Sequence, residues 1–318
     1  VVDLTREDLL KVLPLDEAVA VIGSANADLV VGVEEMPTPG ETIAGGPLEV
    51  LPGGKSSNQA VASALLGAPT SFIGAVGADG NGSLLESSMS AAGVNIDHLK
   101  RVDKPTSCAV ITVDSHAENM IVVTSGANET VDVEMLEAAK AAIESAKVLG
   151  LALEIPLETV VKAAEIAQAA NVITVVNPSP LPDEIPDALL AATDVLVVNE
   201  GEMQAIAGDF SGDWAEAERR VHRLGVKRAI VTLGPRGAVV LENGATHVST
   251  IDVDVVDTTG CGDSFTGSVM AALAAGSNLV DAARFASIVA SYASAGKGAQ
   301  RSYGNIAEID AALFPDEE

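Results

Sequence analysis

The chain has 318 residues, and its 45 Asp and Glu outnumber its 18 Lys and Arg, which gives a formal net charge of −27. This balance excludes most proteins that bind nucleic acid or anionic membranes, because such binding uses clusters of Lys and Arg, and no basic run is longer than the Arg219-Arg220 pair. With 48% hydrophobic residues, the chain is expected to fold around a large core. The acidity indicates a well-solvated surface and, in some proteins, a saline habitat.

The two cysteines, Cys108 and Cys261, form no Cys-x-x-Cys pattern and have no His cluster beside them. The sequence therefore predicts neither a zinc site nor a disulfide framework. The first residues mix charged and apolar side chains, unlike a signal peptide. No apolar run reaches the roughly 18 residues of a transmembrane helix. We expect a cytoplasmic protein with no membrane partner.

Short apolar runs alternate with segments of helical periodicity along most of the chain. The predicted strands are 18–22, 71–76, 148–153, 172–176, 195–198 and 229–233, with apolar helix faces at 157–167 and 285–292. This alternation predicts an α/β fold with a mostly parallel central sheet and helices on both faces. Residues 29–50 contain strands with Pro-Gly turns, and 108–113 with 120–124 form a hairpin pattern, so we expect a small β subdomain as well.

The segment from Asp257 to Asp263 joins a strand-like run at 251–256 to a helical segment at 264–275. Its glycines, Gly260 and Gly262, allow backbone N–H groups to converge on an anion at the helix N-terminus, where the helix dipole adds to the attraction. A carboxylate at Asp263 would repel a phosphate, yet it could accept the proton of an attacking hydroxyl in phosphoryl transfer. A capping Asp with turn glycines explains the segment equally well.

Two more glycine-rich turns accompany predicted elements. Gly-Gly-Lys-Ser-Ser-Asn at 53–58 opens a helical segment, but it is not a Walker A loop, because that motif needs a Gly where Glu49 stands. Thr-Leu-Gly-Pro-Arg-Gly at 232–237 follows a strand and could lie along a nucleotide, although a simple β-turn is the commoner interpretation. The turn at 23–28 has one of the three glycines of a dinucleotide fingerprint, which disfavours an oxidoreductase.

Polar side chains follow two predicted strands at their carboxyl ends, where open α/β sheets bind ligands. Asn26 and Asp28 follow the first strand, and the two oxygens of Asp28 match two neighbouring sugar hydroxyls; an Asx turn is the competing interpretation. Asn199 and Glu202 follow the strand at 195–198 with the spacing of an N-terminal capping box. The functional alternative gives Asn199 a phosphate contact and Glu202 a water-mediated contact with Mg²⁺.

Together these segments resemble the ribokinase-type (PfkB) carbohydrate kinases, from about Ala20 to the C-terminus. Each motif alone is modest, but their order along the chain matches the order in that family. The matching segments are Gly-Ser-Ala-Asn-Ala-Asp at 23–28, Pro-Thr-Pro-Gly-Glu-Thr at 37–42, Gly-Gly-Lys at 53–55, Asn-Gln-Ala at 58–60, Ser-Gly-Ala-Asn at 125–128, Asn-Pro at 177–178, Asn-x-x-Glu at 199–202 and Gly-x-Gly-Asp at 260–263. The resemblance implies an N-terminal extension at 1–17 and a kinase domain at 18–318, with a discontinuous β lid from about 29–50 and 106–125.

The resemblance also implies a reaction, the transfer of the γ-phosphoryl group of ATP to the 5-hydroxyl of D-ribose. Asp263 would be the general base, and the backbone of Gly260, Cys261 and Gly262 would form the anion hole. The residues that would hold the sugar are Asn26, Asp28, Gly54, Lys55, Asn58, Glu154 and Asp263. The residues that would line the nucleotide are Asn199, Thr232, Gly234, Gly237 and Gly262.

Two metal ions and a partner follow from the same resemblance. Mg²⁺ would accompany ATP and be placed with the help of Glu202, and a monovalent cation, usually K⁺, would activate the enzyme from beside the anion hole. The carbonyl-rich ligands of that cation would be Asp257, Thr259, Ala293, Gly296, Gly298 and Ser302, although water could satisfy those carbonyls equally well. A homodimer through the lid is expected, because paired lids would protect exposed sheet edges.

Two departures from the family pattern bear on specificity and reactivity. Ser56 and Ser57 stand where members usually have Gly and Ala, which adds hydroxyls beside the expected sugar site and keeps a nucleoside or another pentose open as the acceptor. Cys261 stands where Ala is commoner, either as a small buried filler or as a thiol activated by the helix N-terminus. A non-catalytic sugar-binding regulator is disfavoured, because Asp263 is retained.

Overall fold

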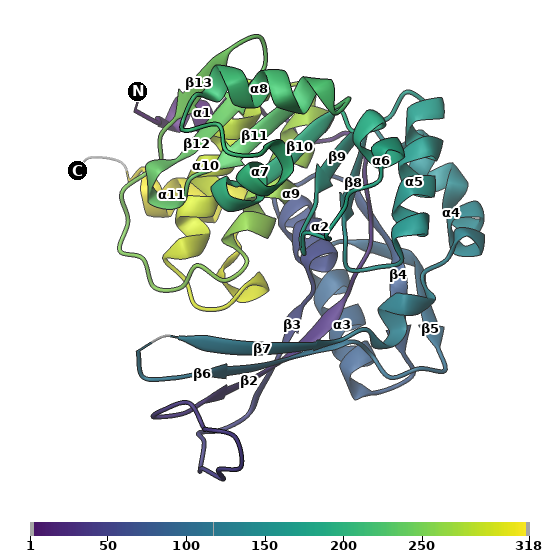
Figure 1. The fold of residues 1–318 in the computed structure, drawn as a ribbon, viewed down its shortest axis with the longest axis vertical. Coiled ribbons are helices and arrows are strands. Elements are labelled where there is room, and N and C mark those ends of the chain that lie inside the picture. Colours follow the sequence, from purple (N-terminus) through teal and green to yellow (C-terminus); the bar gives the residue numbers. More distant parts are fainter. Residues whose placement is uncertain (1–2, 117, 316–318) are drawn as a thin grey trace.

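The computed structural model describes residues 3–116 and 118–315 and contains a large central sheet (Figure 1). Its strands are Val19–Ile22 (β1), Thr70–Gly77 (β4), Asn95–Val102 (β5), Val148–Ala152 (β8), Ile173–Asn177 (β9), Val195–Asn199 (β10), Arg228–Thr232 (β11), Ala238–Leu241 (β12) and Ala245–Val248 (β13). Within the described residues they lie in the order β13-β12-β11-β10-β9-β8-β1-β4-β5. From β11 to β5 all neighbours are parallel, and β12 and β13 add an antiparallel edge. The predicted mostly parallel sheet is confirmed.

Helices cover both faces of this sheet. One hydrophobic core contains side chains of α1 (Arg6–Leu10), α2 (Lys55–Leu65), α3 (Gly80–Ala91), α9 (Cys261–Ala274), α10 (Leu279–Ser294) and α11 (Ile306–Leu313). A second core contains side chains of α4 (Val133–Ser145), α5 (Leu157–Ala169), α6 (Asp187–Ala191), α7 (Glu200–Ala207) and α8 (Trp214–Arg223). Along β1, Val19 and Val21 enter the first core and Ala20 and Ile22 the second, which explains its uninterrupted apolar run. In the described part of the chain, no helix has the length and apolar character needed to cross a membrane.

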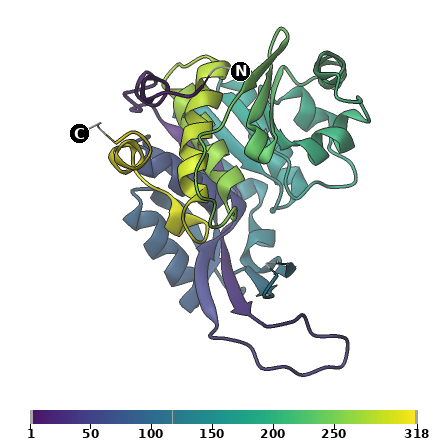
Figure 2. The same cartoon turned by 90° about the vertical axis from the view of Figure 1, so that its left-hand side faces the viewer.

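A second, smaller sheet projects from the body as the lid (Figures 1 and 2). Its strands are Asn26–Gly32 (β2), Glu49–Gly53 (β3), Cys108–Val113 (β6) and Asn119–Thr124 (β7), in the order β3-β2-β6-β7. β2 begins at Asn26 and β3 ends at Gly53, so both strands reach three residues closer to the body than the predicted segment at 29–50. The strand itself therefore carries Asn26 and Asp28 to the edge of the large sheet.

Two details of the predicted elements are wrong. Residues 251–256 form no strand, because the backbone hydrogen bonds at the end of this segment go to a helix: the N–H groups of Val256 and Asp257 both donate to the carbonyl of Ser294 at the end of α10, at 2.8 and 3.2 Å. The helix predicted from 264 begins three residues earlier, at Cys261. Asp263 consequently lies in the first turn of α9, where backbone N–H groups have no partner within the helix.

The N-terminal segment packs on the body rather than extending from it. Leu9 of α1 is fully buried in the first core. The carboxylate of Asp8 accepts from Lys11 Nζ at 2.7 Å and from Arg284 Nη1 of α10 at 3.3 Å. Apolar burial and the ion pair between Asp8 and Arg284 together hold α1 against α10.

The strand order places a ligand site at one edge of the sheet. The chain proceeds from β1 outward to β4 and β5, then returns with β8 on the other side of β1. Open α/β sheets bind ligands at the carboxyl ends of the strands where the order reverses in this way. Ser24 and Asn26 follow β1 at this point, and Glu154 follows β8.

The contact between α2 and α9 leads to a test of stability. A Cβ built on Gly267 of α9 would lie 2.5 Å from the carbonyl oxygen of Gln59 and 2.9 Å from Cβ of Ala62, both in α2. We expect Gly267→Ala to lower the free energy of unfolding by about 1–3 kcal/mol, although Ala favours a helix, because the two backbones must separate. Thermal and urea unfolding measure this. The control is Gly80→Ala at the exposed start of α3, where the new Cβ meets nothing within 4 Å. Its free energy of unfolding should stay within about 0.5 kcal/mol of wild type. An equally small effect of Gly267→Ala would contradict the packing argument.

Candidate active site

The N-terminus of α9 is the centre of the site. Gly260 precedes the helix with φ of 74°, and a Cβ there would lie 2.6 Å from both Cβ of Ala299 and Oη of Tyr303, so only glycine fits. The N–H of Cys261 donates to the carbonyl of Thr258 at 3.2 Å. Those of Gly262 and Asp263 have no acceptor among the residues that the structure describes. Two unpaired N–H groups and the helix dipole thus offer an anion-binding position.

The carboxylate of Asp263 is buried in the same turn, with 8% of the residue exposed. Its Oδ2 accepts from Asn58 Nδ2 at 3.0 Å and its Oδ1 from Gln59 Nε2 at 3.4 Å, both from α2. Burial raises the pKa of Asp263 to about 6, and the charge of Lys55 with the two amide hydrogen bonds limits the rise. A carboxylate with this pKa is ionised at neutral pH and is a stronger base than an exposed Asp.

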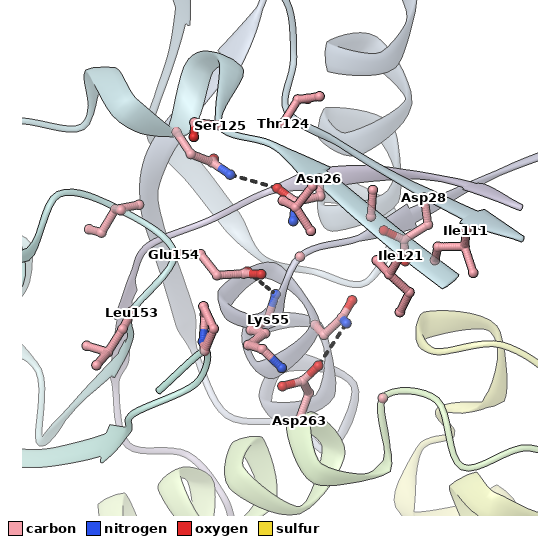
Figure 3. A pocket seen from close by; sticks show the side chains of 18 of the residues that line it. Asn26, Asp28, Lys55, Ile111, Ile121, Thr124, Ser125, Leu153, Glu154 and Asp263 are labelled. Atoms are coloured by element: carbon pink, nitrogen blue, oxygen red, sulfur yellow. Dashed lines mark hydrogen bonds between the residues drawn. The ribbon is translucent and has the colours of Figure 1, made fainter. Parts of the chain in front are cut away.

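A cavity of about 730 Å³ lies between the lid and the carboxyl ends of the strands (Figure 3). The residues of its lining that the sequence assigned to the sugar are Asn26, Asp28, Gly54, Lys55, Asn58, Glu154 and Asp263. The lid adds the apolar side chains of Ala109, Ile111, Ile121 and Val123, and Asp28 lies beside Ala109 in the same sheet. The structure therefore brings the whole predicted sugar set into one cavity that also has apolar lining from the lid.

Hydrogen bonds fix the polar wall of this cavity. Asn26 Oδ1 accepts from Asn128 Nδ2 at 2.7 Å. Glu154 Oε2 accepts from the backbone N–H of Lys55 at 3.0 Å and from Ser24 Oγ, which ties β1, the start of α2 and the end of β8 together. Burial raises the pKa of Asp28 to about 7, with further contributions from the negative charges of Glu154 and Asp263. The pocket thus contains the carboxyl groups of Asp28, Glu154 and Asp263, whose oxygens can accept hydrogen bonds.

A second cavity, of about 660 Å³, lies on the other side of the α9 N-terminus. Thr232, Gly234, Gly237 and Gly262, four residues assigned to the nucleotide, line it together with Cys261. Apolar residues of the irregular segment, Ile251, Val253 and Val255, form another part of its wall. Asn199 is not in this lining; it lies with Lys55 in a cavity of about 160 Å³ that also includes Gly260, Gly262 and Asp263.

Asn199 and Glu202 form the capping box that the sequence allowed. Asn199 Oδ1 accepts from the N–H of Glu202 at 2.8 Å, and Glu202 Oε2 accepts from the N–H of Asn199 at 2.9 Å, at the start of α7. The same two side chains line the 160 Å³ cavity beside Asp263. The described residues contain no group of three or more His, Cys, Asp or Glu that could bind a metal. Mg²⁺ keeps several waters and takes substrate phosphates as ligands, so a single carboxylate suits its placement here.

The residues assigned to a monovalent cation lie close together beside Gly260. Asp257 Oδ1 accepts from the N–H of Thr259 at 2.9 Å, and its Oδ2 accepts from the N–H of Gly298, also at 2.9 Å. Burial opposes but does not outweigh these hydrogen bonds, and the pKa of Asp257 is lowered. A Cβ on Gly296 would lie 2.7 Å from Cβ of Ser302, and the N–H of Gly296 donates to the carbonyl of Ala293 at 3.1 Å. Asp257 thus ties together the two stretches of backbone that contain the predicted cation ligands, and carbonyl oxygens are the donor type that hard cations take.

The two departures from the family pattern have different outcomes. Ser56 and Ser57 are fully buried and do not line the sugar cavity. Ser57 Oγ donates to the carbonyl of Gly53 at 2.5 Å, and Ser56 lies against Gly23, so the expectation of extra hydroxyls beside the sugar is wrong. Burial, then the charges of Asp257 and Asp263, raises the pKa of Cys261 to about 11. This rise, caused mainly by burial, disfavours the activated thiol; Cys261 is half-buried and lines the second cavity.

Four polar residues of the site were missed by the sequence analysis. They are Gln59, Asn128, Gln300 and Tyr303. Asn128 and Gln59 stand inside matched motifs, so the motifs themselves signalled them. Tyr303 Oη donates to the carbonyl of Gly260 at 2.7 Å, and Gln300 donates to Asn58. The sequence carried no signal for these last two, because their partners are more than 40 positions away.

Comparison with known proteins agrees with this geometry. Residues 16–305 match the pfkB family of carbohydrate kinases. The chain is 34% identical to the ribokinase of Haemophilus influenzae over 291 residues, covering 90% of this chain and 95% of the relative. It is 30% identical to the deoxyribokinase of Salmonella typhi, covering 94% and 99%. The structure of Arabidopsis thaliana ribokinase complexed with ribose and ATP matches with a TM-score of 0.85 and 32% identity, over 94% of this chain and 99% of that one.

A family match over most of the chain, relatives above 30% identity and a shared α/β fold with a lid lead to one assignment. The chain belongs to the pfkB family of carbohydrate kinases and is an ATP-dependent sugar kinase.

Proposed function

We propose that this kinase transfers the γ-phosphoryl group of Mg-ATP to the 5-hydroxyl of D-ribose. The observation that carries the proposal is that the first turn of α9 separates two cavities. Gly260 and Asp263 line the acidic cavity under the lid, whereas Cys261 and Gly262 line the nucleotide cavity. The small cavity shares Gly260 and Asp263 with the first of these and Gly262 with the second. An acceptor and a triphosphate bound on either side would meet at a buried base and an anion-binding helix end.

The buried carboxylate of Asp263 accepts the proton of the 5-hydroxyl as its oxygen attacks the γ-phosphorus. The new O–P bond forms while the bond from phosphorus to the β–γ bridging oxygen breaks, and ADP leaves with that electron pair. The unpaired N–H groups of Gly262 and Asp263 stabilise negative charge on the transferring group. The charge of Lys55, whose side chain extends toward Asp263 in Figure 3, acts in the same direction.

Mg²⁺ and K⁺ complete the proposed site. When bound, Mg²⁺ neutralises charge on the β- and γ-phosphates. Glu202 would hold its water shell, and Asp257 with the neighbouring loop carbonyls would hold K⁺. Because Asp257 binds both Thr259 and Gly298, an ion in this loop supports the backbone directly before Gly260.

Ribose is the first candidate because the sugar wall contains two hydrogen-bonding groups from β2. Asp28 offers two acceptor oxygens and Asn26 lies two residues before it, on the same side of the strand. The H. influenzae and A. thaliana relatives are named ribokinases. Deoxyribose is the second candidate, since the S. typhi relative at 30% identity is named a deoxyribokinase. Asp28 favours ribose, because a vicinal diol uses both of its oxygens.

A homodimer through the lid and a cytoplasmic location are part of the proposal. All six residues of β7 are exposed at the lid edge, including Met120, Ile121, Val122 and Val123, each more than half exposed. An exposed apolar edge strand is a pairing surface in solution. Cys108 and Cys261 are free thiols, as suits a reducing compartment.

A substrate panel tests the function. With Mg-ATP, with and without K⁺, ribose should be phosphorylated faster than deoxyribose, other pentoses, hexoses or nucleosides. Asp263→Asn should reduce kcat by roughly 10²- to 10⁴-fold, because the general base is lost, while calorimetry still detects ribose binding. The exposed Asp103→Asn is the control and should behave as wild type. A nearly normal kcat in Asp263→Asn would reject the base, and a preferred acceptor other than ribose would reject the substrate.

The raised pKa values predict an acidic limit of activity. Asp263 titrates at about 6 and Asp28 at about 7, and each acts here as a carboxylate. We expect kcat/KM for ribose at saturating Mg-ATP to fall as the pH decreases below about 7 and to fall more steeply below about 6, because protonation removes first the acceptor of Asp28 and then the base. Asp28→Asn should leave a single ionisation near 6. A profile that is flat down to pH 5 would contradict both assignments.

Light scattering tests the dimer. Val122 lies on the face of β7 opposite the cavity-lining Ile121 and Val123, so a charge at Val122 affects pairing without entering the cavity. We expect wild type to be a dimer at micromolar concentration and Val122→Lys to be a monomer. Val133→Lys, at the exposed start of α4, should remain a dimer. A monomeric wild type would rule out the lid interface.

A further inference from the structure

A chain of hydrogen-bonded side chains leads from α3 to the carboxylate of Asp263. Ser88 Oγ donates to Gln300 Oε1 at 2.7 Å, Gln300 Nε2 donates to Asn58 Oδ1 at 2.9 Å, and Asn58 Nδ2 donates to Asp263 Oδ2 at 3.0 Å. We call Ser88, Gln300 and Asn58 the amide chain. Gln300 lies in the short helix η3 (Gln300–Ser302), is 8% exposed and lines none of the three cavities. No substrate role therefore explains its burial.

The direction of every hydrogen bond in the amide chain is fixed by its last member. An ionised carboxylate only accepts, so Asn58 must present its NH₂ group to Asp263. The carbonyl oxygen of Asn58 then faces Gln300, which must present its own NH₂ group. The remaining oxygen of Gln300 accepts the hydroxyl of Ser88. All donors point toward Asp263, and hydrogen bonds aligned in this way strengthen one another in a buried environment.

Asn58 alone does not secure this arrangement. The terminal torsion of an Asn side chain is broad and roughly two-fold, so the amide can turn and present its oxygen in place of its NH₂ group. An oxygen of Asn58 facing Asp263 would repel the carboxylate and leave the buried NH₂ group without a partner. Gln300 reinforces the orientation that Asp263 requires, because its Nε2–H group donates to the Asn58 oxygen; its Nε2 also donates to Ser57 Oγ at 3.4 Å.

We propose that Gln300 is a positioning residue of the active site, which holds the Asn58 amide so that an N–H group and not an oxygen faces Oδ2 of Asp263. The effect of Gln300 on catalysis rests on the proposed function, in which Asp263 is the general base. The orientation of Asn58 does not depend on which sugar is bound. The side chain acts through Asn58 and touches neither substrate nor nucleotide.

Other titratable groups around Asp263 set the background for the test. Lys55 comes from α2, Glu154 from the end of β8, Asp28 from β2, and Cys261 from α9 itself, and the buried phenol of Tyr303 faces the same region. Burial raises the pKa of Asp263, and the Asn58 hydrogen bond is among the interactions that lower it. Loss of a correctly oriented Asn58 should therefore raise this pKa further while leaving the charged groups in place.

The experiment is a direct titration of Asp263 by NMR in the ligand-free full chain. With ¹³Cγ-labelled Asp, the Asp263 signal is assigned by its absence in Asp263→Asn. We expect Gln300→Met, which keeps length and removes both hydrogen-bonding groups, to raise the titration midpoint by roughly 0.5–1 pH unit, the size expected for one hydrogen bond to a carboxylate. The lower of the two ionisations in the pH profile of kcat/KM, the one near 6 that belongs to Asp263, should rise by the same amount. The KM for ATP should not change.

A double-mutant cycle separates positioning from general damage. Asn58→Ala should raise the midpoint, and Gln300→Met added to Asn58→Ala should cause no further shift, because Gln300 acts only through Asn58. Gln168→Met, at an exposed Gln of α5, is the control and should leave the midpoint unchanged. Ser88→Ala removes the hydroxyl that donates to Gln300 Oε1, and it should raise the midpoint by a smaller amount. It is the milder variant to use if Gln300→Met does not fold.

Unchanged midpoints in Gln300→Met and Ser88→Ala would overturn the proposal. Additive shifts in the double variant would also overturn it, because Gln300 would then act independently of Asn58. Failure of the proposed function is seen elsewhere, in the substrate panel and in the activity of Asp263→Asn. The NMR titration remains a test of the amide chain in that case, since it needs no substrate.

Discussion

The close packing of α2 against α9 is the constraint on which the rest of the structure depends. These helices begin at the same edge of the sheet, and Gly267 lets their backbones approach where any side chain would collide with Gln59. The approach brings Asn58 of one helix within hydrogen-bond distance of Asp263 of the other. It also buries Asp263, and that burial raises the pKa of the carboxylate into the range of a useful base. The close approach of the two helices at Gly267 thus contributes to the raised pKa of Asp263 at the start of α9.

The electrostatics of the site resolve an apparent conflict in the composition. The chain carries a net charge of −27, yet its cosubstrate ATP is itself an anion. Few cationic side chains are near the cavities: Lys55 lines two of them, while Arg236 is paired with Glu200 at 2.5 Å. In the proposed function, backbone N–H groups at the start of α9 and a divalent ion would therefore have the main part in holding phosphate. The acidic surplus lies in the sugar cavity and on the surface, where hydroxyl donors and water satisfy it.

The sequence predicted the fold class well because the two patterns that indicate it, apolar runs and glycine turns, are local. Apolar runs such as β1 and glycine turns such as that of Gly260 are readable from neighbouring residues. Residues 251–256 were mistaken for a strand, because alternating apolar residues also suit a segment that lies along a helix and lines a cavity. Gln300 was missed, because it and Asn58 are 242 positions apart and nothing near either residue indicates the contact. Local motifs and the family resemblance thus predicted residues that line the cavities, and only the folded chain showed what holds them.

The distance along the chain between Asn58 and Asp263 has a consequence for how the protein is made. Asn58 and Asp263 are separated by 205 residues, and α9 and α10 form much of one face of the sheet. A nascent chain that has reached β13 holds every strand of the sheet but leaves its first core without these two helices. Domains fold largely as units during synthesis, so this face of the sheet stays uncovered until residues 261–294 have been made. Up to that point the growing chain lacks these two helices of its first core and also the side chain of Asp263.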